Sequence, residues 1–225
     1  MKFKNFLIFS FIKQDILLIL RNKFGFMLSY VFFILIVFIF PLSFSYDSEI
    51  INYFLPVIIW IAIIISSLIS IEYIYRDEYD NGFIDHLILS SSRLTLILYS
   101  KIITGWLLNG IPISIISFFI FYILTSNIVL AKCLITMLVP SLLIIHCLGC
   151  LGSIITIGLV RSNILLLIII VPLLIPVLLL SLHALKFAQN NMNYGLQFIL
   201  ILFFLSLNLF LIPYISAHLL KLGVD

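Results

Sequence analysis

The sequence predicts an all-α integral membrane protein, and two observations lead to this fold class. First, 64% of the 225 residues are hydrophobic and only 9% are charged, which is too little polar surface to cover a water-soluble globule. Second, cutting the chain at its charges leaves six uncharged windows, each able to hold the ~20 residues that cross a membrane as a helix. We therefore expect one transmembrane domain over residues 1–225 with six spans. The spans are predicted near residues 24–44, 50–71, 101–124, 134–159, 164–182 and 196–217.

The distribution of Lys and Arg predicts how these spans are oriented. Ten of the twelve basic residues lie before the first span, after the last span or in the loops of that same side, and only Lys132 and Lys186 lie in the alternate loops. Because basic loops stay on the cytoplasmic side during insertion, both termini are expected in the cytoplasm, at a bacterial inner membrane rather than a mitochondrial one. The net charge of +3 therefore reflects topology, and we infer no binding to nucleic acid.

Residues 1–23 predict a cytoplasmic amphipathic helix that lies on the membrane surface. Apolar residues such as Phe3, Phe11 and Leu18 recur at roughly helical spacing, as in helices that lie on a membrane surface with one apolar face. The charged residues between them are Lys4, Lys13, Asp15 and Arg21. An uneven lead-in to the first span is the alternative interpretation.

Residues that could carry chemistry are few. The chain has no G-x-x-x-x-G-K-[ST] phosphate loop, so any ATP-driven role requires a separate subunit, and we expect a non-enzymatic protein without a metal site. His146 is predicted in mid-span, without an Asp or Glu beside it in the spans, so we interpret it as a helix-packing donor rather than a proton relay. His183 lies near the outer membrane face, where an interfacial histidine is favoured over a metal or haem ligand.

Small residues cluster in the fourth predicted span. Cys147 and Cys150 have C-x-x-C spacing, but they lie in an apolar run without a second pair of ligands, which favours a structural role. Together with Gly149 and Gly152 they predict a patch where a neighbouring helix approaches closely.

Pro172 and Pro176 lie one turn apart in the fifth predicted span. Each removes a backbone hydrogen bond, so this helix is expected to be kinked or locally opened. The bend could be a moving part or could simply fit the packing.

The acidic segment between spans two and three, residues 72–93, is the most informative part of the chain. Five of the nine acids fall between Glu72 and Asp85. Glu72 and Arg76 are four residues apart, so the second span is expected to continue as a helix past the membrane with these two side chains facing each other. Gly82 then breaks the helix, and apolar residues at helical spacing after it predict a second, short helix. This cytoplasmic helical elbow is predicted to dock a partner, with a solvated loop as the alternative.

The same segment resembles the signature loop of the heme exporter protein B family. Glu72, Arg76, Asp77, Gly82 and Asp85 fit the pattern E-x-x-x-R-D-x-x-x-x-G-x-x-[ED]-x-L. The likeness extends over essentially the whole chain, with departures at Ser162-Asn163, where a Gly pair is expected, and at Ser91-Ser92-Arg93, which replaces a Pro-containing turn. Further matching positions are Lys101, Trp106, Gly110, Ile111, Pro112, Leu148, Gly149, Gly152, Thr156, Gly158, Arg161, Pro172, Ile175 and Pro176.

The resemblance implies an ABC-2-like permease, the membrane subunit of an ABC-type complex for cytochrome c maturation. Two copies would pair with two cytoplasmic ABC ATPase subunits, and the five residues from Glu72 to Asp85 would form the ATPase-coupling segment. ATP hydrolysis would drive haem delivery, or the release of a haem-loaded chaperone from a haem-handling membrane subunit. The chain has only Trp60 and Trp106 and no tryptophan-rich motif, so haem is expected to be handled by the complex rather than bound by this chain. An ABC-2-type export permease for lipid, polysaccharide or drug, and a non-transporting membrane scaffold, are the alternatives.

Overall fold

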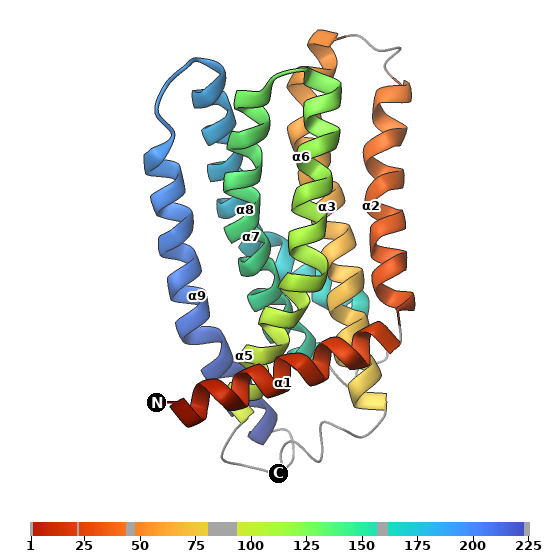
Figure 1. Cartoon of the computed structure of the whole chain (residues 1–225), viewed down its shortest axis with the longest axis vertical. Coiled ribbons are helices and arrows are strands. Elements are labelled where there is room, and N and C mark those ends of the chain that lie inside the picture. Colours follow the sequence, from red (N-terminus) through yellow and green to blue (C-terminus); the bar gives the residue numbers. More distant parts are fainter. Residues whose placement is uncertain (1, 22, 44–47, 81–93, 157–161, 223–225) are drawn as a thin grey trace.

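The computed structural model describes residues 2–21, 23–43, 48–80, 94–156 and 162–222, and all regular structure within them is helical. Long helices run alongside one another, and α1 lies across one end of the bundle, which we call the α1 end (Figure 1). The elements are α1 (Lys2–Arg21), α2 (Phe24–Ser43), α3 (Ser48–Asp80), α5 (Leu94–Gly105), the π-helix η1 (Trp106–Gly110), α6 (Ile111–Thr125), α7 (Ile128–Thr156), α8 (Ser162–Gln189) and α9 (Gly195–Leu222).

Five helical stretches of the described residues are long and apolar enough to cross a membrane. A sixth is added if α1 and α2 count as one bent span, because the pair Ser10–Ile19 and Phe24–Phe40 passes the same test with a bend of 73°. These lengths and compositions confirm an all-helical, multi-pass membrane protein, while the ABC-2-like arrangement stays a prediction. The five stretches are Tyr53–Arg76, Leu94–Thr125, Ile128–Thr156, Ile164–Gln189 and Gly195–Lys221.

The helix that contains the third predicted span is longer than that span. It was expected from residue 101, but the helix starts at Leu94 and runs through α5, η1 and α6 to Thr125. Its 32 residues would measure about 48 Å as an α-helix, more than the ~30 Å hydrocarbon core. An untilted helix of this length would therefore extend beyond the apolar layer.

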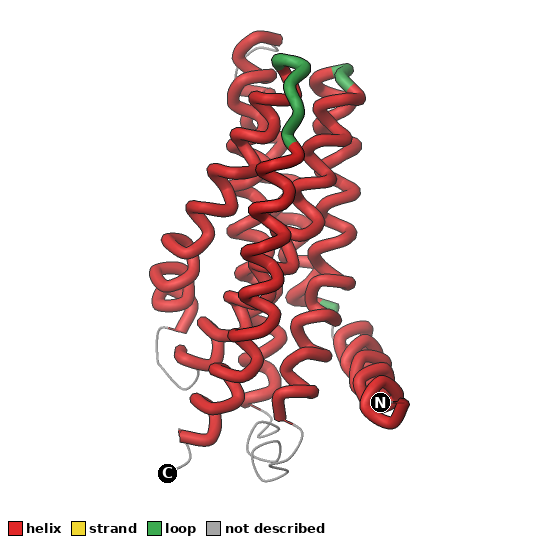
Figure 2. The backbone as a smooth tube through the Cα atoms, turned by 90° about the vertical axis from the view of Figure 1, so that its left-hand side faces the viewer, coloured by secondary structure: helices red, strands yellow, loops and turns green. Residues whose placement is uncertain are grey.

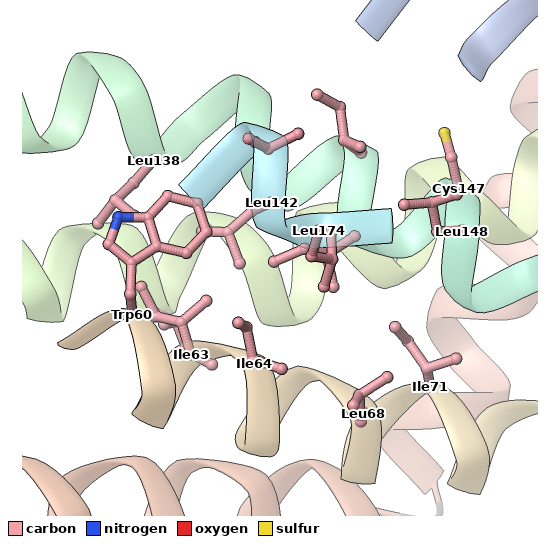
Figure 3. Packing of buried hydrophobic residues seen from close by; sticks show 14 of the residues in the cluster. Trp60, Ile63, Ile64, Leu68, Ile71, Leu138, Leu142, Cys147, Leu148 and Leu174 are labelled. Atoms are coloured by element: carbon pink, nitrogen blue, oxygen red, sulfur yellow. The ribbon is translucent and has the colours of Figure 1, made fainter. Parts of the chain in front are cut away.

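Helix α7 is the centre of the bundle and packs against α3, α5, α6, α8 and α9. Its side chains are buried along most of its length, and Figure 3 shows Leu138, Leu142 and Leu148 of α7 beside Trp60 and Ile71 of α3. The contact is dominated by branched and aromatic side chains, so dispersion forces between closely fitted surfaces hold these helices together.

Two glycines let neighbouring helices approach α7 closely. A Cβ atom added to Gly149 would lie 2.4 Å from the Cδ1 atom of Ile71 in α3, and one added to Gly152 would lie 2.9 Å from the Cδ1 atom of Ile170 in α8. Both distances are shorter than a carbon–carbon contact, so each glycine makes room for an isoleucine. The small-residue patch thus lies where α7 meets α3 and α8.

Helix α8 contains Pro172 and Pro176 and remains helical from Ser162 to Gln189. In Figure 1 its cyan first part runs obliquely behind the other helices, whereas its blue last part runs parallel to them. Both prolines are exposed on the bundle surface. A bend that moves and a bend that only fits the packing both stay predictions.

Candidate functional site

The last turns of α3 bear the first part of the predicted coupling segment. The guanidinium of Arg76 lies 3.4 Å from the Glu72 carboxylate, to which it donates a hydrogen bond one helical turn away. Helix α3 continues to Asp80, which confirms the predicted extension beyond the apolar run. The Arg76 side chain is 59% exposed and that of Glu72 is 18% exposed, so the arginine is the more accessible member of the pair.

The structure describes only one of the remaining residues of the predicted segment. Asp77 belongs to α3, whereas Gly82 and Asp85 lie outside the described residues. The elbow after α3 therefore stays a prediction, and the described site consists of the end of α3, the start of α5 and the helix α1 that lies across that end.

Helix α1 is attached to α5 by a buried polar contact. The Nζ atom of Lys101 lies 3.9 Å from Oδ1 of Asp15, and the hydroxyl of Ser100 donates a 3.1 Å hydrogen bond to Oδ2 of the same carboxylate. Only 2% of the Lys101 side chain and 14% of the Asp15 side chain are exposed. Burial raises the pKa of Asp15 above its ordinary value, while the Lys101 charge and the Ser100 hydrogen bond lower it.

Two further glycines close the packing at the α1 end. A Cβ atom on Gly25, in the first turn of α2, would lie 2.1 Å from the Tyr73 ring of α3. A Cβ atom on Gly105 of α5 would lie 2.8 Å from Cδ2 of His146 in α7. At these two points α2 presses on α3, and α5 presses on α7, with no space for a larger side chain.

His146 itself is buried and faces α5. Its Nδ1 atom lies 2.8 Å from the carbonyl oxygen of Leu142, and since a carbonyl can only accept, Nδ1 carries the proton in this contact. The imidazole thus bonds to its own helix and packs on Gly105, a geometry that agrees with a packing role.

A π-helical segment interrupts the third span between α5 and α6. The amide of Asn109 in η1 donates a 2.8 Å hydrogen bond to the Ser29 hydroxyl of α2, which donates in turn to the carbonyl of Ser66 in α3. Next to it, the Tyr30 hydroxyl donates to the carbonyl of Leu108. Pro112 has no N–H, so it cannot serve as the α-helical donor for that carbonyl. The Tyr30 side chain of α2 therefore supplies a donor that the helix lacks.

Other candidate ligands are isolated from one another. Among the described residues no group of three or more His, Cys, Asp or Glu side chains could hold a metal ion. Cys133, Cys147 and Cys150 are buried, and His183 is exposed on α8. That this chain binds no metal or haem of its own stays a prediction.

Sequence reasoning did not identify Asp15 and Lys101 as partners. Lys101 was used for topology, as the start of a predicted span and as a position of the family resemblance, and Asp15 only as one charge of the amphipathic segment. A lysine inside an apolar helix is unusual enough to suggest pairing, but a sequence separation of 86 residues leaves its partner undefined.

The long apolar helices packed around the central α7 define a multi-pass α-helical membrane protein. A sequence profile of the family described as CcmB protein matches residues 6–223. The chain belongs to that family.

Several curated relatives carry the name "Heme exporter protein B". The protein from Haemophilus influenzae is 28% identical over 214 residues, which is 95% of this chain and 97% of the relative. The Pseudomonas aeruginosa protein is 29% identical over 86% of this chain and 87% of its own, and the Bradyrhizobium diazoefficiens protein is 23% identical over 96% and 98%. The similarity thus covers the whole transmembrane domain.

Proposed function

We propose that this protein is the non-catalytic membrane subunit of an ABC-type complex for cytochrome c maturation. The observation that carries the proposal is the family match over residues 6–223, together with relatives named heme exporter protein B along almost their full lengths. A separate ATPase subunit supplies the hydrolysis, because this sequence has no phosphate-binding loop of its own.

The end of α3 supports a docking role for the segment that follows it. Helix α3 extends past its apolar run and ends in an acidic turn, with Arg76 exposed beside Glu72. Acidic and basic groups concentrated at one membrane face provide charge complementarity for a soluble partner. In this proposal Glu72, Arg76, Asp77, Gly82 and Asp85 contact the ATPase at the cytoplasmic face of an inner membrane, and two copies of the chain bind two ATPase subunits.

The output of the complex concerns haem. ATP-driven movement of α3 and of the span beginning with α5 promotes haem delivery, or the release of a haem-loaded chaperone from a haem-handling membrane subunit. The chain handles haem only as part of the complex, because its sequence has only Trp60 and Trp106 and no tryptophan-rich motif.

Co-purification tests the docking assignment. The wild-type chain should carry an ATPase subunit through purification, and a variant with Asp77→Lys and Asp85→Lys should lose both this subunit and c-type cytochrome assembly. The matched control is Asp47→Lys with Glu49→Lys, which reverses two acids that the predicted topology places in the loop on the opposite side. Normal co-purification by the first variant would overturn the assignment.

A further inference from the structure

The N-terminal part of the chain contacts both helices that flank residues 81–93. Helix α1 packs along α5, and Figure 1 shows it crossing the lower ends of α5 and α3. Figure 2, turned by 90°, shows α1 almost end-on beside the bundle rather than within it. Two specific contacts hold this N-terminal part of the chain on the bundle.

The first contact is the buried ion pair with α5. Asp15 accepts from Ser100 and lies beside Lys101, whose side chain is almost fully buried. Phe11 and Ile19 lie one turn before and after Asp15 and also pack toward the bundle, so the pair is enclosed by apolar groups. Buried charges are costly to desolvate and tolerate only a narrow geometry, and they therefore fix which surfaces meet more than they add stability. The contact thus sets the position of α1 along α5.

The second contact is made where α1 passes into α2. The Met27 amide bonds to the carbonyl of Lys23, which begins α2 immediately after α1. Gly25 then lies against the Tyr73 ring so closely that no side chain would fit. Tyr73 belongs to the same turns of α3 as Glu72 and Arg76. The N-terminal unit is therefore held on α3 at one end and on α5 in its middle.

We infer that α1 and the first turn of α2 together form a brace between α5 and α3, and that Asp15 and Lys101 are positioning residues which make the two helices move together when the ATPase acts. This inference rests on the proposed function and adds a role to residues outside the coupling segment. Without the pair, α3 would still dock the ATPase, but its displacement would reach α5 and the π-helical span less effectively.

Single substitutions separate docking from coupling. Lys101→Met and Asp15→Asn should leave the ATPase subunit bound at the wild-type level, yet lower the yield of mature c-type cytochrome about tenfold, the upper part of the range by which residues between two sites modulate coupling. Lys13→Met is the matched control, because Lys13 is an exposed lysine of α1, and it should leave the yield unchanged. A wild-type yield from Lys101→Met would overturn the inference.

Ser100→Ala serves if a charge substitution prevents the protein from accumulating in the membrane. It removes the hydrogen bond to Asp15 without leaving a charge buried alone, and should lower the yield about threefold with normal ATPase binding. An unchanged yield here would also overturn the inference. If the wild-type chain carried no ATPase at all, the proposed function would fail instead, so the two failures are distinguishable.

A reversible cross-link provides the readout that a purely structural contact would not change. Asp15→Cys and Ser100→Cys would be combined in a chain whose three buried cysteines are changed to alanine. A short, reducible thiol cross-linker should restore the stimulation by this chain of ATP hydrolysis by the ATPase subunit in the purified complex. Reduction of the cross-link should abolish this stimulation. Equal stimulation in the cross-linked and reduced states, at full ATPase occupancy, would contradict a bracing role.

Discussion

The hydroxyl of Tyr99 donates a 2.7 Å hydrogen bond to the carbonyl oxygen of Leu209, which lies four residues before Pro213. Proline has no N–H, so this carbonyl lacks its α-helical donor, and a side chain of α5 provides one to α9. Tyr30 does the same for Leu108 in the third span. Within a membrane no water is available to satisfy such a carbonyl, so these tyrosines make prolines tolerable in two spans.

Tyr99→Phe should therefore destabilise the protein by about 0.6–1.7 kcal/mol, the range of side-chain hydrogen bonds inside membrane proteins. The same substitution should cost less in a Pro213→Ala background, where residue 213 regains an N–H for Leu209. Thermal unfolding in detergent would measure both effects, with the exposed Tyr122→Phe as the control. An identical cost in the two backgrounds would show that the hydroxyl acts through another group.

The chain of bonds through Ser29 leads to an asymmetric prediction. Ser29 accepts from the Asn109 amide and donates to Ser66, while Oδ1 of Asn109 is buried without a hydrogen-bond partner. Ser29→Ala would leave the whole amide unsatisfied, whereas Asn109→Leu removes the amide altogether, and an unsatisfied buried group costs about 1–3 kcal/mol. Ser29→Ala should hence be the more destabilising change, and Asn109→Leu should relieve part of its cost.

The control for this pair is Ser114→Ala, because that hydroxyl bonds only within its own helix, to Ile111. Thermal unfolding in detergent would compare the wild type, the three single variants and the double variant of Ser29→Ala with Asn109→Leu. Strictly additive losses would mean that Ser29 and Asn109 are not coupled.

The spans and the extension of α3 could be predicted from local sequence. Continuous apolar runs fix a membrane helix because its backbone must bond internally, and the spacing of Glu72 and Arg76 defines their contact once the helix exists. The family resemblance likewise depended on motifs that are written in the sequence, and the profile match confirmed it.

Features that depend on contacts between distant helices could not be predicted. Lys101 was taken as the edge of a span because it is charged. In the structure it is buried and paired with Asp15. It lies within α5, which begins seven residues earlier, at Leu94. The π-helix segment is stabilised by a bond from its Asn109 amide to the Ser29 hydroxyl and by a bond from the Tyr30 hydroxyl to its Leu108 carbonyl. Both partners lie in α2, and no pattern within residues 94–125 contains them.

Gly149→Ala should destabilise the contact of α7 with α3 by about 1–3 kcal/mol, the usual cost of overpacking. The new methyl group would lie 2.4 Å from Cδ1 of Ile71, the atom that Ile71→Val removes. Ile71→Val should therefore stabilise the Gly149→Ala protein, although it costs about 0.5–1.5 kcal/mol in the wild type. Gly152→Ala, with its nearest atom at 2.9 Å, should be milder, and no rescue of it by Ile71→Val is expected.

The buried Asp15 predicts a pH dependence that Lys101→Met exposes. The pKa of Asp15 is raised by burial and lowered by Lys101 and Ser100, so removal of Lys101 should raise it further above the ordinary value of 3.8. A carboxyl whose pKa is higher in the folded than in the unfolded protein contributes stability below the unfolded pKa and loses it as pH rises through the folded pKa. The Lys101→Met protein should thus lose more thermal stability than the wild type between acidic and neutral pH.

Asp15→Asn combined with Lys101→Met is the control, since it lacks the titrating group, and its pH profile should show no such loss. Parallel profiles for the wild type and Lys101→Met would mean that the Lys101 charge does not act on Asp15.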